Sequence, residues 1–458
     1  MTMQLETRLA DFIRDTQLGD IPAEAVHVAK LVLRSAMATG VAGASEDGIA
    51  ALRELLRSRG GAAQARTLVH GDRLPAHAAA QLNGTMCRAL DFCDAMAPGI
   101  HIGSSLVPAA FAAAELHGGC SGAEFLAALA VGCEVGARFN LSESMYDGFD
   151  PTGVAIVFAS TAAAARILRL SPRQTQHALG LAFNRCAGSF QSNIDGTLAV
   201  RMVQGWVAQS GIECAQMAQL GITGPLNFLG GLYGYAHLYG RGRLAPESVV
   251  EGLGREWRLL QMMFKKYPSC GATQGMTELM LQLVHALDLK PQQVQRVQVR
   301  LPPYCHRLVG HAFVLGDNPR VNAQFSVQYC VANAIVRGAS KLPHFKPEQV
   351  ADAQVLALIE RVESFADPAL DARGHTAVDV RLLALDGQLH ERQLDIAPGY
   401  PGNPLSEAQH LARFNDCMAY AALPLPGAQV TSLLDKLARL ATLPDVTVLL
   451  DDLVCAGA

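Results

Sequence analysis

Alanine-rich apolar runs, interrupted by glycine and proline, fill the first half of this 458-residue chain. Residues 125–130 are typical, a short apolar run with Glu124 before it and Glu134 shortly after it. Hydrophobic residues make up 50% of the chain but aromatic residues only 6%, so small side chains that allow close helix packing carry most of the apolar surface. This pattern predicts a mainly α fold, and the length suits two or three domains with a large core.

Proline, serine and glycine mark the expected helix ends in this half. Residues 21–24 and 171–174 open helices, residues 221–225 close one, and residues 1–15 form an amphipathic surface helix and not a signal peptide. We find no stretch with the length and apolarity of a transmembrane span.

The pattern changes near Trp257. Residues 294–301 and 376–382 alternate with period two, the second run before the turn Asp386-Gly387, which predicts two strands. Residues 323–337 and 351–359 have helical patterns, and helices resume at Pro404. We therefore expect a large all-helical domain over 1–257, a smaller inserted α+β lid domain over 258–399, and C-terminal helices over 400–458 that rejoin the first domain.

Charge and cysteine usage narrow the class of partner. The formal net charge of −4 provides no basic surface for nucleic acid or for an anionic membrane, so a small molecule is the expected partner. The 11 cysteines stand singly, without a CxxC pair or a His-Cys cluster at metal-ligand spacing. They indicate reduced thiols in a cytoplasmic protein with no metal site.

Asp91, Asp94 and His101 lie close together before an apolar, helix-like run. A histidine takes and returns a proton near neutral pH, and a carboxylate held by the same turn can fix its tautomer. Taken alone, such residues are more often a loop histidine and a helix-end acid. The rest of the chain favours the acid-base interpretation.

Several separated stretches carry a resemblance to one family. They are 90–94 with His101 and 108–110, then 148–153, 195–197, 205–206, 221–225, 265–270, 323–326 and 403–406. In number, order and spacing they resemble the 2-methylcitrate dehydratase and cis-aconitate decarboxylase (MmgE/PrpD) family along nearly the whole chain. The resemblance implies a homodimeric enzyme without metal or cofactor, whose helical and lid domains enclose a cleft for carboxylate substrates.

Family members eliminate water, decarboxylate or epimerise, and each reaction needs a base and cations beside a carboxylate. The resemblance assigns His101 as general base or acid, Asp91 as the group that orients it, and Lys265 as the cation that pairs with a substrate carboxylate. The further residues expected to bind substrate are Asp94, Asp150, Arg201, Lys266, Tyr267, Cys270 and Tyr329.

The chain also departs from the family pattern. Cys93-Asp94-Ala95 replaces Asp-Asp-Thr and His101-Ile102-Gly103-Ser104 replaces His-Pro-Ser, while Asp150, Val203 and Gln274 replace histidines and Val200 a lysine. Each lost cation removes about 1.5–3 kcal/mol of charge-assisted hydrogen bonding to a carboxylate. We therefore expect a divergent member whose substrate has fewer carboxylates, or carries an amine that pairs with Asp150.

Three functions are compatible with this pattern. The first is a cofactor-independent lyase, most plausibly a dehydratase; the second is an epimerase or isomerase that removes and returns an alpha proton; the third is a catalytically silent, ligand-binding member. Cys270 is either a proton donor or a small packing residue. We assign no role to the isolated histidines His306, His311, His375 and His390.

Overall fold

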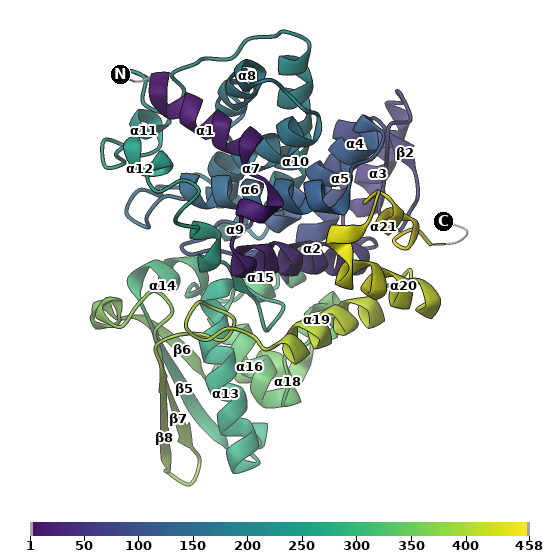
Figure 1. Cartoon of the computed structure of the whole chain (residues 1–458). Helices are drawn as coiled ribbons and strands as arrows, with labels where there is room; N and C mark the ends of the chain where they lie inside the picture. The colour runs from purple at the N-terminus through teal and green to yellow at the C-terminus, as the bar shows by residue number, and fades with distance from the viewer. Residues whose placement is uncertain (1–2, 456–458) are drawn as a thin grey trace.

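A computed structural model describes residues 3–455 (Figure 1). The fold is mainly α, as predicted, with long helices in the first half and one four-stranded sheet in the second. The first-half helices are α1 Met3–Asp15, α2 Ala23–Gly43, α3 Ile49–Ser58, α4 Ala76–Arg88, α5 Gly103–His117, α6 Gly122–Phe139, α7 Pro151–Ile167, α8 Pro172–Phe183, α9 Gln191–Ile194, α10 Ala199–Gln219, α11 Tyr235–Leu238 and α12 Glu247–Val250.

The helix starts follow the sequence signals. Ser171 caps α8, its hydroxyl accepting from the backbone N–H of Gln174 while Pro172 takes the first helical position. The predicted N-terminal helix is α1, and positions 1–2 lie outside the described residues. Contrary to the expectation from the sequence, one helix, α2, is long and apolar enough to span a membrane; 72% of its apolar window is buried within the protein, so core packing accounts for its composition.

Small residues let the helices approach closely. Helices α4 and α10 meet at Gly84 and Gly205, where a Cβ added to Gly205 would lie 2.2 Å from the hydroxyl of Thr85. Helices α5 and α7, both rich in alanine, are buried along most of their length. This packing brings the N-termini of α5 and α7 to the same region of the molecule.

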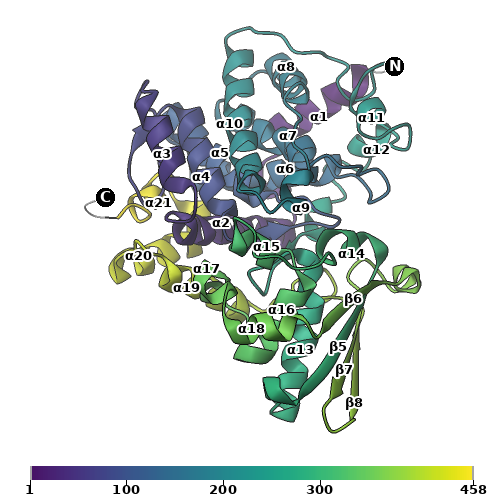
Figure 2. The same cartoon turned by 180° about the vertical axis from the view of Figure 1, so that it is seen from behind.

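The second half adds a mixed sheet of order β6-β5-β7-β8, with α13 and α16 packed against it (Figures 1 and 2). Strands β5 and β6 are parallel, whereas β5–β7 and β7–β8 are antiparallel. The elements are α13 Gln274–Leu287, β5 Val294–Leu301, α14 Pro303–Val309, α15 Pro319–Gln324, α16 Val327–Arg337, α17 Pro347–Val350, α18 Ala353–Ile359, β6 Val362–Ala366, β7 Val378–Ala384 and β8 Leu389–Leu394.

Both predicted strands, 294–301 and 376–382, are present as β5 and β7. The predicted helix over 323–337 is divided at Phe325, because Ser326 caps a new helix there. Strands β6 and β8 were not predicted.

Two large hydrophobic cores organise the described residues, and a small third cluster contains Ala95, Met263, Ala397 and Tyr400. One large core contains residues from 5 to 264, Leu342 and residues from 405 to 453, and the other contains Val200 and residues from 267 to 384. The C-terminal helices are α19 Glu407–Tyr420, α20 Gly427–Ala438 and α21 Val448–Asp451, and α19 packs on α2. The division at residues 258 and 400 into a lid and a body stays a prediction.

Candidate active site

A short two-stranded ladder joins two distant segments of the chain. Strand β3 (Asp94–Ala95) pairs antiparallel with β4 (Met263–Phe264), with Asp94 opposite Phe264. In the turn between α4 and β3, Asp91 adopts a left-handed backbone with φ of 48°, a conformation that aspartate tolerates better than most residues. The ladder and this turn bring the side chain of Asp91 to Lys265.

Asp91 lies between two cations in a buried cluster. The Lys265 ammonium donates to the Asp91 carboxylate at 2.6 Å and to its carbonyl oxygen at 3.1 Å, and Arg88 donates to the same carboxylate oxygen. Burial alone would raise the pKa of Asp91, but the charges of Arg88 and Lys265 outweigh burial and hold it below its usual value. Two positive charges and one negative charge leave the cluster with an excess of +1.

His101 has one ring nitrogen engaged. Its Nδ1 lies 2.9 Å from the carbonyl oxygen of Asp94, and since a carbonyl only accepts, Nδ1 carries the proton. A neutral imidazole carries one proton, so Nε2 is the unprotonated nitrogen, and it makes no hydrogen bond within the described part of the chain. Burial, together with the charges of Arg88 and Lys265, lowers the pKa of His101 well below 6.5.

Asp94, and not Asp91, orients this histidine. The Asp94 carboxylate accepts the backbone N–H groups of Ile102 and Gly103, at 3.1 and 2.9 Å, and so fixes the turn into α5. The predicted hydrogen bond from Asp91 to His101 is not seen among the described residues, because the Asp91 carboxylate is held by Arg88 and Lys265. Asp94 was also expected to bind substrate, but its side chain is fully buried and does not line the cavity described next.

A cavity adjoins His101; its empty space is about 600 Å³ when the opening to solvent is included, and about 50 Å³ of it is reached by a water-sized sphere. Segments from both hydrophobic cores line it. Its polar lining residues are Arg88, His101, Asp150, Thr152, Asn193, Gln204, Cys270, Tyr304, His375 and Tyr400. Three buried polar atoms on these residues have no hydrogen-bond partner: Arg88 Nε, Asn193 Oδ1 and Gln204 Oε1. Buried polar atoms without partners are costly, and a polar ligand would satisfy them.

Of the residues expected to bind substrate, Asp150 and Cys270 line this cavity. Asp150 caps α7, accepting the N–H of Gly153 at 3.0 Å, and burial raises the pKa of its carboxyl. Burial also raises the pKa of the Cys270 thiol, to about 11, so the thiol keeps its proton at neutral pH. The N-terminus of α7 adds partial positive charge beside Thr152.

Models of the two MmgE/PrpD domains match the chain in succession, the N-terminal domain over residues 7–247 and the C-terminal domain over 267–425. The chain belongs to the MmgE/PrpD family.

Its relatives include the cis-aconitate decarboxylase-like protein oryM of Aspergillus oryzae, 27% identical over 395 residues, with 80% of each chain covered. Human cis-aconitate decarboxylase is 26% identical over 392 residues, covering 82% of this chain and 79% of the relative. The Aspergillus terreus enzyme of the same name is 26% identical over 397 residues, covering 80% of each.

Within this MmgE/PrpD protein, Lys265 does not line the cavity; it contacts Asp91 instead of a substrate position. Four further predicted binding residues also lie elsewhere. Arg201 donates to the Asp47 carbonyl, Lys266 and Tyr267 both contact Glu278, and Tyr329 donates to the His344 carbonyl. Successive side chains in an extended segment point to opposite sides, so Lys266 points away from the buried Lys265, which explains why Lys266 lies outside the cavity.

Arg88, His375, Tyr304 and Tyr400 line the cavity but were missed. Arg88 carried one usable signal, an arginine at the end of an alanine-rich helix three residues before Asp91. His375 was judged an isolated surface residue, yet it pairs with Glu143 at the cavity edge. Only the tertiary fold brings these residues to one wall.

No group of three or more potential metal-ligating side chains is found in the described ranges.

Proposed function

We propose that this chain is a lyase that removes a proton from the carbon next to a carboxylate of a small carboxylic acid, with His101 as the base. The observation that carries the proposal is the fixed tautomer of His101, whose Nδ1 is tied to the Asp94 carbonyl while Nε2 is unprotonated beside the cavity. A lowered pKa keeps this nitrogen available as a base at neutral pH.

Arg88 supplies the charge that such a reaction needs. Arg88 lines the cavity, and its Nε–H is buried without a partner among the described residues, while its Nη1 is held by Asp91, which Lys265 holds in turn. A substrate carboxylate bound to Arg88 becomes enolate-like when Nε2 takes the neighbouring proton, and the excess positive charge stabilises that anion. Asp91 and Lys265 act through Arg88 and are positioning residues.

The second half of the elimination breaks the carbon–oxygen bond to a hydroxyl on the next carbon. The electron pair of the enolate forms the double bond, and the hydroxyl leaves as water after taking a proton. Tyr304, Tyr400 and Cys270 line the cavity and carry their protons at neutral pH, since burial raises the pKa of each. Any of the three can donate this proton.

The charge count favours a substrate with one or two carboxylates. The cluster of Arg88, Asp91 and Lys265 has an excess of +1, and Asp150 places an acid on the cavity wall. A tricarboxylate would bring three negative charges to this site, at a desolvation cost that one excess cation does not repay.

Decarboxylation is the second candidate, because the relatives named above are cis-aconitate decarboxylases. There the carbon–carbon bond breaks, CO₂ leaves, and the carbanion takes a proton from an acid. An unprotonated His101 does not supply that proton, whereas the thiol of Cys270 or a phenol can. Because Nε2 of His101 is unprotonated, we favour proton abstraction over decarboxylation.

Product analysis tests the proposal. The purified chain is incubated with malate, citrate, 2-methylcitrate and cis-aconitate, and products are identified by proton NMR with CO₂ measured in parallel. We expect net loss of water from a hydroxy acid, and a fall of about 10²-fold or more in His101→Ala. His390→Ala, a histidine outside the cavity, is the matched control and keeps full activity. Release of CO₂ would select the second candidate, and no turnover of any acid would refute both.

A further inference from the structure

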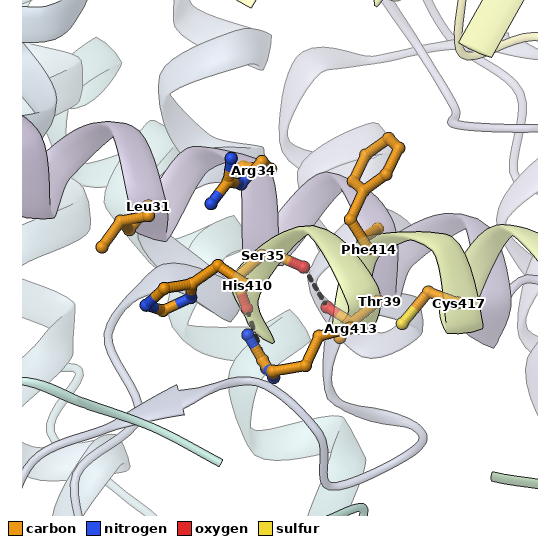
Figure 3. A pocket seen from close by; sticks show the side chains of 9 residues that line it. Leu31, Arg34, Ser35, Thr39, His410, Arg413, Phe414 and Cys417 are labelled. Atoms are coloured by element: carbon orange, nitrogen blue, oxygen red, sulfur yellow. Dashed lines mark hydrogen bonds between the residues drawn. The ribbon is translucent and has the colours of Figure 1, made fainter. Parts of the chain in front are cut away.

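A second cavity lies between α2 and α19 and shares no lining residue with the first (Figure 3). Its polar wall is formed by Arg34, Ser35 and Thr39 of α2 and by His410 and Arg413 of α19. The empty space is about 230 Å³ when the opening to solvent is included, but a water-sized sphere reaches only about 10 Å³ of it, which is room for a ligand of about the size of one water molecule. None of these residues takes part in the reaction proposed above.

Arg413 is a buried cation without a carboxylate partner. Its side chain is 8% exposed, donates to the Phe92 carbonyl at 2.7 Å and to the Ser35 hydroxyl at 3.5 Å, and stacks on the Phe92 ring. Its Nε is buried with no hydrogen-bond partner. Within residues 5–455 no aspartate or glutamate forms an ion pair with Arg413, and Asp94 acts on it only from a longer distance. Buried charges in proteins are normally paired, so this one calls for an anion.

Two neighbours supply further unused donors. Arg34 pairs with Glu407 through Nη1, while its Nη2 is buried without a partner. His410 is 6% exposed, and its ring forms no hydrogen bond with the described residues. Arg34 and Arg413 carry two positive charges, and the only carboxylate in contact with either, within the described residues, is that of Glu407, on Arg34. Asp94 acts on Arg413 without contact.

We propose that this cavity binds a small monovalent inorganic anion of the size of chloride. Such an ion accepts hydrogen bonds and donates none, which matches unused donors on Arg34 and Arg413 and the ring of His410. It also gives Arg413 the contacting negative charge that it lacks. A groove lined by His27, Lys30 and the Arg34–Glu407 ion pair adjoins the cavity and connects it to the surface.

The bound anion would stabilise the two segments that carry Asp91 and Lys265. Arg413 contacts Phe92, which follows Asp91 in the chain, and His410 packs edge-on against Phe264, which precedes Lys265, with ring centroids 4.9 Å apart. The cavity therefore adjoins both segments that carry the buried ion pair.

Thermal unfolding at constant ionic strength tests this proposal without reference to enzymatic activity. Sodium methanesulfonate, whose anion is too bulky for the cavity, is replaced stepwise by sodium chloride up to 200 mM. We expect a saturable rise in Tm of about 1–3 °C, because a ligand that binds only the folded state stabilises it by mass action. A Tm that does not respond to chloride would overturn the proposal.

Two variants locate the effect. Ser35→Asp places a carboxylate beside Arg413, so we expect a higher Tm in methanesulfonate and no further rise with chloride. Arg34→Gln changes a partly exposed position and serves as the second variant in case Ser35→Asp does not fold. It should raise the chloride concentration that gives half of the Tm increase by about tenfold or more. Arg185→Gln, an exposed arginine far from α2 and α19, is the control and keeps the full response. A response unchanged in both site variants would place the ion elsewhere and contradict the proposal.

Discussion

Replacing Arg88 by methionine removes the one cation that both lines the cavity and has an unpaired donor. Arg88 and Lys265 together carry +2 against the −1 of Asp91, so Arg88→Met lowers the excess from +1 to zero while Asp91 keeps its bond to Lys265. A charge-assisted hydrogen bond to a carboxylate contributes about 1.5–3 kcal/mol, which corresponds to a loss of roughly 10- to 150-fold in substrate affinity.

The assay is steady-state kinetics on the acid that turns over best, with circular dichroism to show that the variant is folded. We expect Arg88→Met to lower kcat/KM by at least this factor, and Arg88→Lys to recover part of it, because lysine restores the charge without the planar fork. Lys266→Met is the matched control, since Lys266 pairs with Glu278 outside the cavity. An Arg88→Met enzyme with kcat/KM within threefold of wild type would refute the role of Arg88.

Three further predictions follow from the site. Burial holds the pKa of His101 well below 6.5, so the base stays unprotonated as the pH falls to 6.5. We expect kcat/KM to stay constant from pH 8 to 6.5 and to decline only at lower pH. A pH–rate profile with its midpoint above 6.5 would contradict this. Gly103→Ala places a Cβ 2.3 Å from Asp94 Oδ1 and should cost about 1–3 kcal/mol in urea unfolding and lower kcat, while Gly427→Ala, with open space around it, should do neither. Cys270, whose pKa is raised to about 11, should resist iodoacetamide at pH 7.5 by mass spectrometry; rapid labelling would indicate a thiolate.

The fold was predictable where local signals and tertiary packing agree. Residues 294–301 alternate clearly because β5 lies inside the sheet and is covered on one side, and they were predicted to the residue. Strand β8 was missed because it is an edge strand of mostly exposed residues, with charged side chains in place of alternation. Strand β6 was missed because it is short and pairs with β5 over a long sequence separation.

The candidate site was predictable in its components but not in its contacts. The sequence marks Asp91, His101 and Lys265, and the structure brings all three to one region. The sequence could not show that the main-chain carbonyl of Asp94 holds His101, because every residue has such a carbonyl, whatever its side chain. It also could not place Arg88 at the cavity wall, since that depends on how α4 packs against α10.

The most direct measurement of the central claim is incorporation of solvent deuterium into the substrate carbon next to the carboxylate, comparing wild type with His101→Gln. The account predicts deuterium at this carbon in the wild type, because His101 returns a solvent-derived deuteron to the enolate-like intermediate, or adds it when the elimination runs in reverse. It predicts a fall of about 10²-fold or more in the variant, because Nε2 of His101 is the base. Exchange at the wild-type rate in a folded His101→Gln enzyme would show that another group removes the proton.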